Sequence, residues 1–196
     1  MEVKIILSFI AIAIGLLAYI PYFKDILTGK TKPHIFSWFG WMIMEAIAFF
    51  AIMAGKGSAG AWPHLISAIV CLGTVLLCLK YGEKNITLPD KLCIILSMIA
   101  IVLWQLTNNP LWAIIFITVA DALAYAPTFR KAYYKPYEET VLTFGLNVIK
   151  QVLVLLALST YSLTTVLFDV YLIAANTSFV TMLIIRRRQV ERKIHS

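Results

Sequence analysis

The sequence predicts an all-α integral membrane protein with seven transmembrane helices, from its composition, the length of its apolar runs and an internal repeat. Hydrophobic residues make up 61% of the 196 residues and charged residues only 14%, against about 45–50% and about 25% in an average soluble domain. A membrane-spanning helix needs about 20 apolar residues. Seven such runs leave too few residues for a separate soluble domain.

In chain order, the spans are expected at about 4–23, 35–54, 60–80, 91–107, 110–129, 137–158 and 163–185. Turn-forming residues separate consecutive runs, among them Gly29, Pro33, Gly55, Gly82, Pro110 and Pro136. Each run is continuously apolar, which indicates a helix, because a barrel strand alternates apolar and polar residues.

The basic residues fall on one side of this topology. Of the 17 Lys and Arg residues, all but Lys4, Lys56 and Lys150 lie near the ends of the first, third, fifth and seventh spans or in the loops and tail that follow them. The positive-inside rule then places the N-terminus outside and the C-terminus in the cytoplasm. This spread argues against nucleic-acid binding and predicts contacts with anionic lipid headgroups at the cytoplasmic face.

A short motif occurs twice. Residues 18–23 read Ala-Tyr-Ile-Pro-Tyr-Phe and residues 124–129 read Ala-Tyr-Ala-Pro-Thr-Phe, and a basic residue follows each. The first and fifth spans therefore correspond. Phe-Gly pairs at residues 39–40 and 144–145 extend the correspondence to the second and sixth spans, and both glycines are expected to permit close helix packing.

Two units of three spans share one orientation only if an extra span reverses the chain between them, and the fourth span does so. We therefore expect two parallel three-helix bundles joined by a linker helix. Residues 1–82 would form the first bundle, 83–108 the linker and 109–196 the second bundle with a short basic tail. Substrate sites in transporters built from such repeats lie near the membrane midplane between the repeats.

This pattern, with Pro21 and Pro127 near the cytoplasmic ends of equivalent helices and a short basic loop after each, resembles the PQ-loop superfamily. That superfamily includes the SWEET sugar transporters, the PnuC vitamin-precursor transporters and the KDEL receptor. The family's Pro-Gln pair is half present, as Pro21-Tyr22 and Pro127-Thr128. The resemblance implies alternating access with the two prolines as hinges. The sequence also resembles small bacterial membrane proteins, which implies the bacterial inner membrane.

Charged and amide side chains within the spans supply the candidate site, because an ionisable group at the bilayer centre costs about 2.5–3.5 kcal/mol and so calls for a reason. Glu45 lies near the middle of the second span. Asn147, Lys150 and Gln151 follow helical spacing on the sixth span and share one face. The Phe-Gly alignment makes Lys150 the counterpart of Glu45, so we expect an ion pair between them.

Two further spans carry polar groups. Asp121 lies in the middle of the fifth span without an obvious partner, and Tyr125 is one turn away on the same face. An unpaired carboxylate at this depth predicts proton or cation coupling. On the seventh span Asn176 is expected near the midplane and Asp169, on the same face, in the outer third within reach of the outer interface. His64, near the start of the third span, is expected at that interface.

Trp38 and Trp41 share the face of Glu45. A wall of the cavity and an anchor in the aromatic belt are both open for Trp38. We expect a transporter of a small polar or ring-containing solute, such as a sugar, nucleoside or vitamin precursor. The two tryptophans and Tyr125 would contact its ring, and Asn147, Gln151 and Asn176 would hydrogen-bond to it.

The alternative is a membrane receptor of the same fold without net transport. An enzyme is not expected, because no zinc-ligand helix motif is present and His34 and His64 fall near opposite faces. Cys71, Cys78 and Cys93 have no metal-ligand spacing, so neither a metal nor a cofactor is expected. A homo-oligomer is compatible with the sequence.

Overall fold

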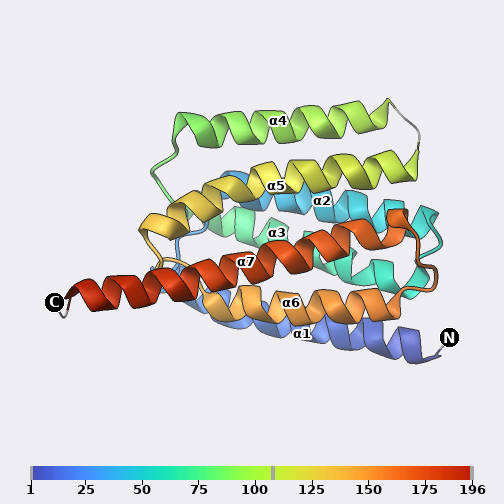
Figure 1. Cartoon of the computed structure of the whole chain (residues 1–196), viewed down its shortest axis with the longest axis horizontal. Helices are drawn as coiled ribbons and strands as arrows, with labels where there is room; N and C mark the ends of the chain where they lie inside the picture. The colour runs from blue at the N-terminus through green and yellow to red at the C-terminus, as the bar shows by residue number, and fades with distance from the viewer. Residues whose placement is uncertain (1, 107–108, 195–196) are drawn as a thin grey trace.

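The computed structural model of the protein describes residues 2–106 and 109–194, and these residues are helical apart from the connecting turns (Figure 1). The elements are α1 (Glu2–Leu27), α2 (Ile35–Ala54), the 3₁₀ helix η1 (Ser58–Ala61), α3 (Trp62–Tyr81), α4 (Leu88–Gln105), α5 (Pro110–Tyr134), α6 (Val141–Ala157) and α7 (Leu163–Ile194). The seven α-helices coincide with the expected runs. The main differences are a later start of α6 and a longer α7.

Five helical segments of the described chain are long and apolar enough to cross a membrane: α1, α2, η1 with α3, α5 and α7. α6 is apolar but has only 17 residues. Large apolar side chains remain on the outside of the molecule, and Phe9 and Leu79 are both 67% exposed. Such a surface is stable only against another apolar phase. The chain is therefore, by length and composition, a helical membrane protein.

The helices connect alternately at two ends of the molecule (Figure 1). At the N-terminal end lie the N-terminus and the starts of α3, α5 and α7. At the opposite end lie the turns after α1, α3 and α5 and the C-terminal part of α7. We call this second end the basic end, because nearly all Lys and Arg residues belong to it.

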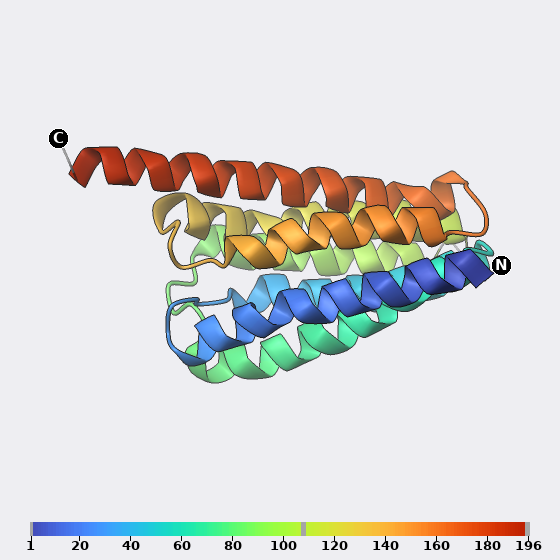
Figure 2. The same ribbon diagram turned by 90° about the horizontal axis from the view of Figure 1, so that it is seen from below.

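α3 packs against both α1 and α2, and α7 packs against both α5 and α6. For description, we call α1–α3 and α5–α7 the first and second three-helix units. They meet where α1 packs on α6 and where α2 packs on α5, while α4 lies along α5 on the outside of the molecule (Figures 1 and 2).

Matching hydrogen bonds connect the two units. Ser37 of α2 donates to the Ala124 carbonyl of α5 at 2.6 Å, and Thr143 of α6 donates to the Ala18 carbonyl of α1 at 2.9 Å. Each carbonyl lies three residues before the proline of its helix. These bonds pair residue 37 with residue 143, whereas the Phe-Gly pairs would match residue 37 with residue 142. The structural alignment of α2 with α6 is thus shifted by one residue.

Because of this shift, the two glycines have different surroundings. A Cβ on Gly40 would lie 3.0 Å from the Ala124 Cβ, so this glycine permits close packing of α2 on α5 as expected. A Cβ on Gly145 would meet no heavy atom within 4 Å, and the expectation is wrong for this residue. In the structural alignment Gly145 matches Phe39, which is 39% exposed and faces outward.

Candidate functional site

A cavity of about 50 Å³ lies between the two units. Six helices contribute to it, and every residue that the sequence indicated for solute binding or coupling lies on its wall. The lining residues are Tyr19, Trp38, Trp41, Glu45, Cys71, Asp121, Tyr125, Phe144, Asn147, Lys150, Gln151, Leu172 and Asn176. This volume holds a few water molecules. A ring-containing solute needs a wider cavity than this conformation provides.

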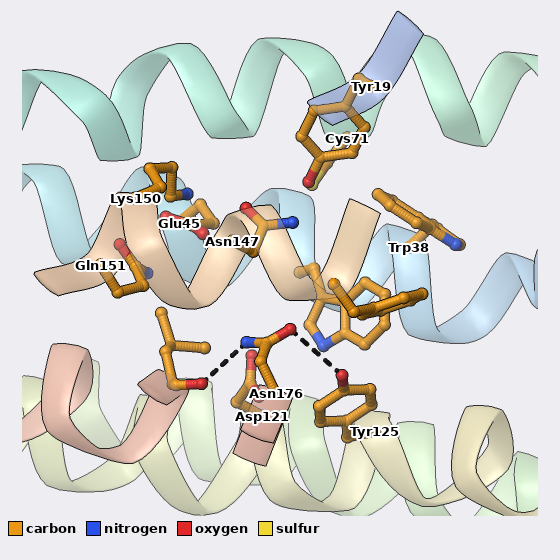
Figure 3. Close-up of a pocket in the computed structure, with 13 residues that line it drawn as sticks. Tyr19, Trp38, Glu45, Cys71, Asp121, Tyr125, Asn147, Lys150, Gln151 and Asn176 are labelled. Carbon is orange, nitrogen blue, oxygen red and sulfur yellow. Dashed lines mark hydrogen bonds between the residues drawn. The ribbon is translucent and has the colours of Figure 1, made fainter. Parts of the chain in front are cut away.

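Aromatic rings form the wall toward the basic end (Figure 3). The Trp41 ring centroid lies 4.9 Å from that of Trp38 and 4.9 Å from that of Tyr125, both in edge-to-face geometry. Trp38 is only 2% exposed, so it lines the cavity and does not anchor the protein at the membrane interface. A flat solute could stack here only after Trp41 turns away from one of its neighbours.

Amide side chains of α6 and α7 face one another across the cavity (Figure 3). Tyr125 donates its hydroxyl to Asn176 Oδ1 at 3.3 Å, and Asn147 donates Nδ2 to the Thr143 carbonyl at 3.1 Å. The buried Oε1 of Gln151 accepts no hydrogen bond from a described residue. Because a buried acceptor without a donor is unfavourable, Gln151 is suited to accept from water or from a bound solute.

Asp121 has a partner that its neighbours in the sequence do not reveal. Tyr171 of α7 donates its hydroxyl to Asp121 Oδ2 at 2.8 Å, and Asp121 is 1% exposed. The expectation of a carboxylate without a partner is therefore wrong. Asp121 is thus not the unpaired carboxylate from which a coupling role was expected, although it lines the cavity.

The expected ion pair between Glu45 and Lys150 does not form. Glu45 Oε2 lies 2.6 Å from His64 Nδ1, and Lys150 Nζ donates to Ser67 Oγ at 2.7 Å. No carboxylate oxygen of a described residue is within 4.0 Å of Lys150 Nζ. The one-residue shift explains the error, because it makes Gln151 the counterpart of Glu45. Successive side chains of an α-helix point about 100° apart, so a shift of one residue changes which side chain of α6 faces Glu45.

His64 and Asp169 are buried behind Glu45 of the cavity wall, so the expectation that they reach the outer interface is wrong. His64 Nε2 lies 3.1 Å from Asp169 Oδ1, and both residues are 0% exposed. Glu45, His64 and Asp169 therefore form a continuous chain of ionisable groups, which we call the acidic triad. Sequence reasoning missed it, because both residues lie near helix ends and their partners are distant in the sequence.

A buried ion pair closes the helix packing at the basic end. Lys131 of α5 contacts the Glu139 carboxylate and donates to the Lys32 carbonyl at 2.5 Å, which joins the second unit to the first. Tyr22 of α1 donates to the same carboxylate at 3.4 Å. Lys131 and Glu139 are 3% and 1% exposed, so the closure at this end rests on charges removed from water.

A second group of charges lies beside this closure. Arg130 binds Asp90 with two nitrogens at 2.6 and 3.0 Å, and His34 Nε2 lies 3.5 Å from the same carboxylate. Burial lowers the pKa of His34, more strongly than Asp90 raises it. Burial alone would raise the pKa of Glu83, but the Asn85 N–H and the Lys135 ammonium hold it below its usual value.

Apolar and backbone contacts close the N-terminal end. Leu158, which is fully buried, packs on Gly60, where a Cβ would lie 2.7 Å from its side chain. Ser159 donates its N–H to the Gly57 carbonyl at 3.2 Å, and Lys4 donates to the Leu158 carbonyl at 2.6 Å. The two units are thus held together at both ends of the molecule by contacts between them.

The two prolines expected to act as hinges, Pro21 and Pro127, lie outside the cavity lining. α1 continues through Pro21 to Leu27, and α5 continues through Pro127 to Tyr134. Among the described residues, no group of three or more His, Cys, Asp or Glu side chains is arranged to hold a metal ion. Comparison of the chain with protein-family models, with curated proteins and with solved structures gave no match.

Proposed function

We propose that the protein is a small-solute transporter that works by alternating access through the central cavity. The observation that carries this proposal is the convergence of aromatic, amide and charged side chains from both three-helix units on one buried cavity. Each polar group at this depth costs free energy. Side chains that served only to hold the helices together would not require an acceptor without a hydrogen bond, such as Gln151 Oε1, whereas a solute-binding site can use it.

The architecture that we propose is three plus one plus three, with the N-terminus outside and the C-terminus in the cytoplasm. Its support is the equivalent packing of α3 and α7 within their units and the matching bonds from Ser37 and Thr143. α4 is the single helix between the units and reverses the direction of the chain. The lopsided distribution of Lys and Arg supports the orientation, and the bacterial inner membrane is the proposed location.

The lining residues favour a neutral or cationic solute with a ring and several hydrogen-bond donors. Glu45 and Asp121 contribute carboxylates to the wall against one lysine, Lys150. An anionic solute would meet a net negative surface there unless protons were bound. Gln151 Oε1 offers a free acceptor, and Trp41 offers a ring face once it turns. A nucleoside or a vitamin precursor has these features.

Alternating access requires that the two ends open in turn. The contacts that close each end join the two units: Lys131 with the Lys32 carbonyl at the basic end, and Ser159 with the Gly57 carbonyl at the N-terminal end. Rocking of one unit against the other would break one set while the other holds. Pro21 and Pro127, each next to an inter-unit bond, are the proposed hinges.

Solute counterflow in proteoliposomes tests the proposal. A thermal-shift screen of nucleosides, vitamin precursors, sugars and amino acids first identifies a ligand, because binding to the folded state raises the melting temperature. We expect counterflow of that ligand, with loss of at least tenfold in Trp41→Ala. Trp112→Ala is the matched control, because Trp112 is 48% exposed on the outer surface.

Absence of counterflow with a confirmed ligand would refute transport. Saturable binding that depends on Trp41 without counterflow would support the receptor alternative. Equal effects of the Trp41 and Trp112 variants would show that the cavity is not the binding site.

A further inference from the structure

The acidic triad links the two units on the N-terminal side of the cavity. Glu45 comes from α2, His64 from the first turn of α3 and Asp169 from the second turn of α7. The imidazole lies between the carboxylates, with Nδ1 at 2.6 Å from Glu45 and Nε2 at 3.1 Å from Asp169. The His64–Asp169 contact is one of the contacts that hold α7 of the second unit against the first unit.

Both nitrogens of the ring face a carboxylate oxygen, which fixes how many protons the triad must hold. A neutral imidazole has one N–H and one lone pair. In that state one of the two short N···O contacts would set a lone pair against a carboxylate. His64 Nδ1 shares a hydrogen bond with Glu45, whereas the 3.1 Å contact of Nε2 with Asp169 has ion-pair distance but not hydrogen-bond geometry. Neither oxygen of Asp169 accepts a hydrogen bond from a described residue, so no other donor offsets the repulsion. An extra proton on the ring makes both contacts attractive.

The charges around His64 lead to the same state. Two carboxylates contact His64, from Glu45 of α2 and Asp169 of α7. The other ionisable side chains on the wall of the cavity that Glu45 lines are Lys150 of α6, Asp121 and Tyr125 of α5, Cys71 of α3 and Tyr19 of α1, and Lys4 of α1 lies at the same end of the molecule. η1 contributes none. With Asp121 ionised, the charges of Glu45, Asp121, Asp169 and Lys150 sum to −2 beside a neutral ring, and an imidazolium reduces the sum to −1. The proton on His64 thus compensates one buried negative charge, which would otherwise be costly.

A metal ion is a poorer occupant than a proton. Metal ligands must point at one centre, whereas the two carboxylates lie against opposite nitrogens of the ring. His64 is therefore positioned as the bridge between two acids. The bound species that this arrangement fits is a hydrogen ion on the ring.

We propose that the acidic triad is the proton-binding site of the transporter, and that its proton holds α7 against α3 and keeps the N-terminal end shut. The role of this proton in transport rests on the proposed function, whereas the existence of the proton-binding site does not. Release of the proton leaves a lone pair of His64 against Asp169 or Glu45. The contact then becomes repulsive and favours opening at the N-terminal end.

The charge state of His64 can be measured without any transport assay. The chain has three histidines, so nitrogen-15 labelling of histidine in the full-length protein gives few signals, and His64→Gln assigns the one from the triad. At about pH 7.5 an ordinary histidine is mostly neutral. We expect both ring nitrogens of His64 to carry protons, and the ring of His34 to be neutral.

Two carboxylate variants test whether the extra proton on His64 depends on the triad itself. Asp169→Asn keeps the shape but removes one charge, so His64 should lose its extra proton at the same pH. Asp90→Asn, beside His34 at the other end of the molecule, is the matched control and should leave the His64 signals unchanged. A single protonated nitrogen on His64 in the unmodified protein would overturn the proposal, as would an imidazolium that persists in Asp169→Asn.

Counterflow then tests the coupling role. In the unmodified protein the rate should change at least fivefold between about pH 6 and pH 8.5, and Asp169→Asn should remove most of this dependence. Retention of the full dependence in Asp169→Asn would refute coupling by the triad. An imidazolium with the expected response to Asp169→Asn, in a protein without counterflow, would instead uphold the proton site and refute transport.

Discussion

Replacement of Lys131 by methionine tests whether buried charges close the basic end. Methionine keeps most of the apolar length of lysine and removes the ammonium. In the structure that ammonium contacts the Glu139 carboxylate and donates to the carbonyls of Lys32 and Glu138 at 2.5 and 3.2 Å. Its loss leaves the Glu139 carboxylate at 1% exposure, and among the described residues the one remaining donor to it is the Tyr22 hydroxyl at 3.4 Å.

The expected magnitude follows from this burial. Removal of one partner from a buried ion pair costs about 3–5 kcal/mol, because the other charge remains out of water, whereas apolar replacement of both partners is often nearly neutral. Lys131→Met should therefore lower the free energy of unfolding by about 3–5 kcal/mol. The double variant Lys131→Met with Glu139→Leu should recover more than half of this loss.

Denaturant unfolding in detergent measures both values, and Lys30→Met provides the control. Lys30 is an exposed lysine of the same end, and its replacement should change the stability by less than about 0.5 kcal/mol. A loss below about 1 kcal/mol for Lys131→Met would contradict the reasoning. So would a double variant that is less stable than the single one, because the two charges would then contribute independently.

Three further predictions follow from the packing and the charges. Gly40→Ala should lower the free energy of unfolding by about 1–3 kcal/mol because its Cβ crowds Ala124, whereas Gly145→Ala should raise it by about 0.5–1 kcal/mol; thermal unfolding of both variants decides this. Burial lowers the pKa of His34, so its neutral ring contributes stability that is complete above about pH 6.5 and is lost as the pH falls through the lowered pKa. His34→Gln should make the free energy of unfolding less dependent on pH in this range. An unchanged loss of stability at acidic pH in this variant would exclude His34 as its cause. Asp121→Asn should reduce the preference for cationic over neutral ligands in a competition assay, and an unaltered preference would exclude a role in charge selection.

The helices and the residues of the cavity wall could be predicted from the sequence because both depend on local rules. A long apolar run must form a helix in a membrane, since each backbone polar group needs a partner within the segment. A polar side chain in such a run must face the protein interior. Glu45, Asp121, Lys150 and Asn176 therefore converge on one cavity, whatever the details of the packing.

The pairing of these residues was beyond the sequence, because it depends on helix rotation. The Phe-Gly alignment of α2 with α6 was one residue out, and that error turned the counterpart of Glu45 from Gln151 into Lys150. The same shift accounts for the open surroundings of Gly145. Short motifs with common residue types fix a register only loosely, whereas the bonds from Ser37 and Thr143 fix it in space.

The acidic triad could not be predicted from the sequence for a different reason. Depth in the membrane was counted from the ends of the spans, which placed His64 and Asp169 at the outer interface. In the structure Leu158 and the η1 segment cover this end of the cavity, so residues near the helix ends are buried. A cover formed by a turn and a 3₁₀ helix leaves no periodic signal in the sequence.

The two closures also respond differently to dissolved salt. At the basic end, Lys32 pairs with Glu138 and Lys135 with Glu83, and both lysine side chains are more than 40% exposed. Ions in solution screen such pairs over about 8 Å at physiological ionic strength. The side chain of Leu158 at the opposite end packs by apolar contact on Gly60, and strongly hydrated salts such as sulfate strengthen apolar contacts. Rising concentrations of such a salt would therefore weaken the exposed ion pairs of the basic end, leave the buried Lys131–Glu139 pair nearly unscreened, and strengthen the packing of Leu158.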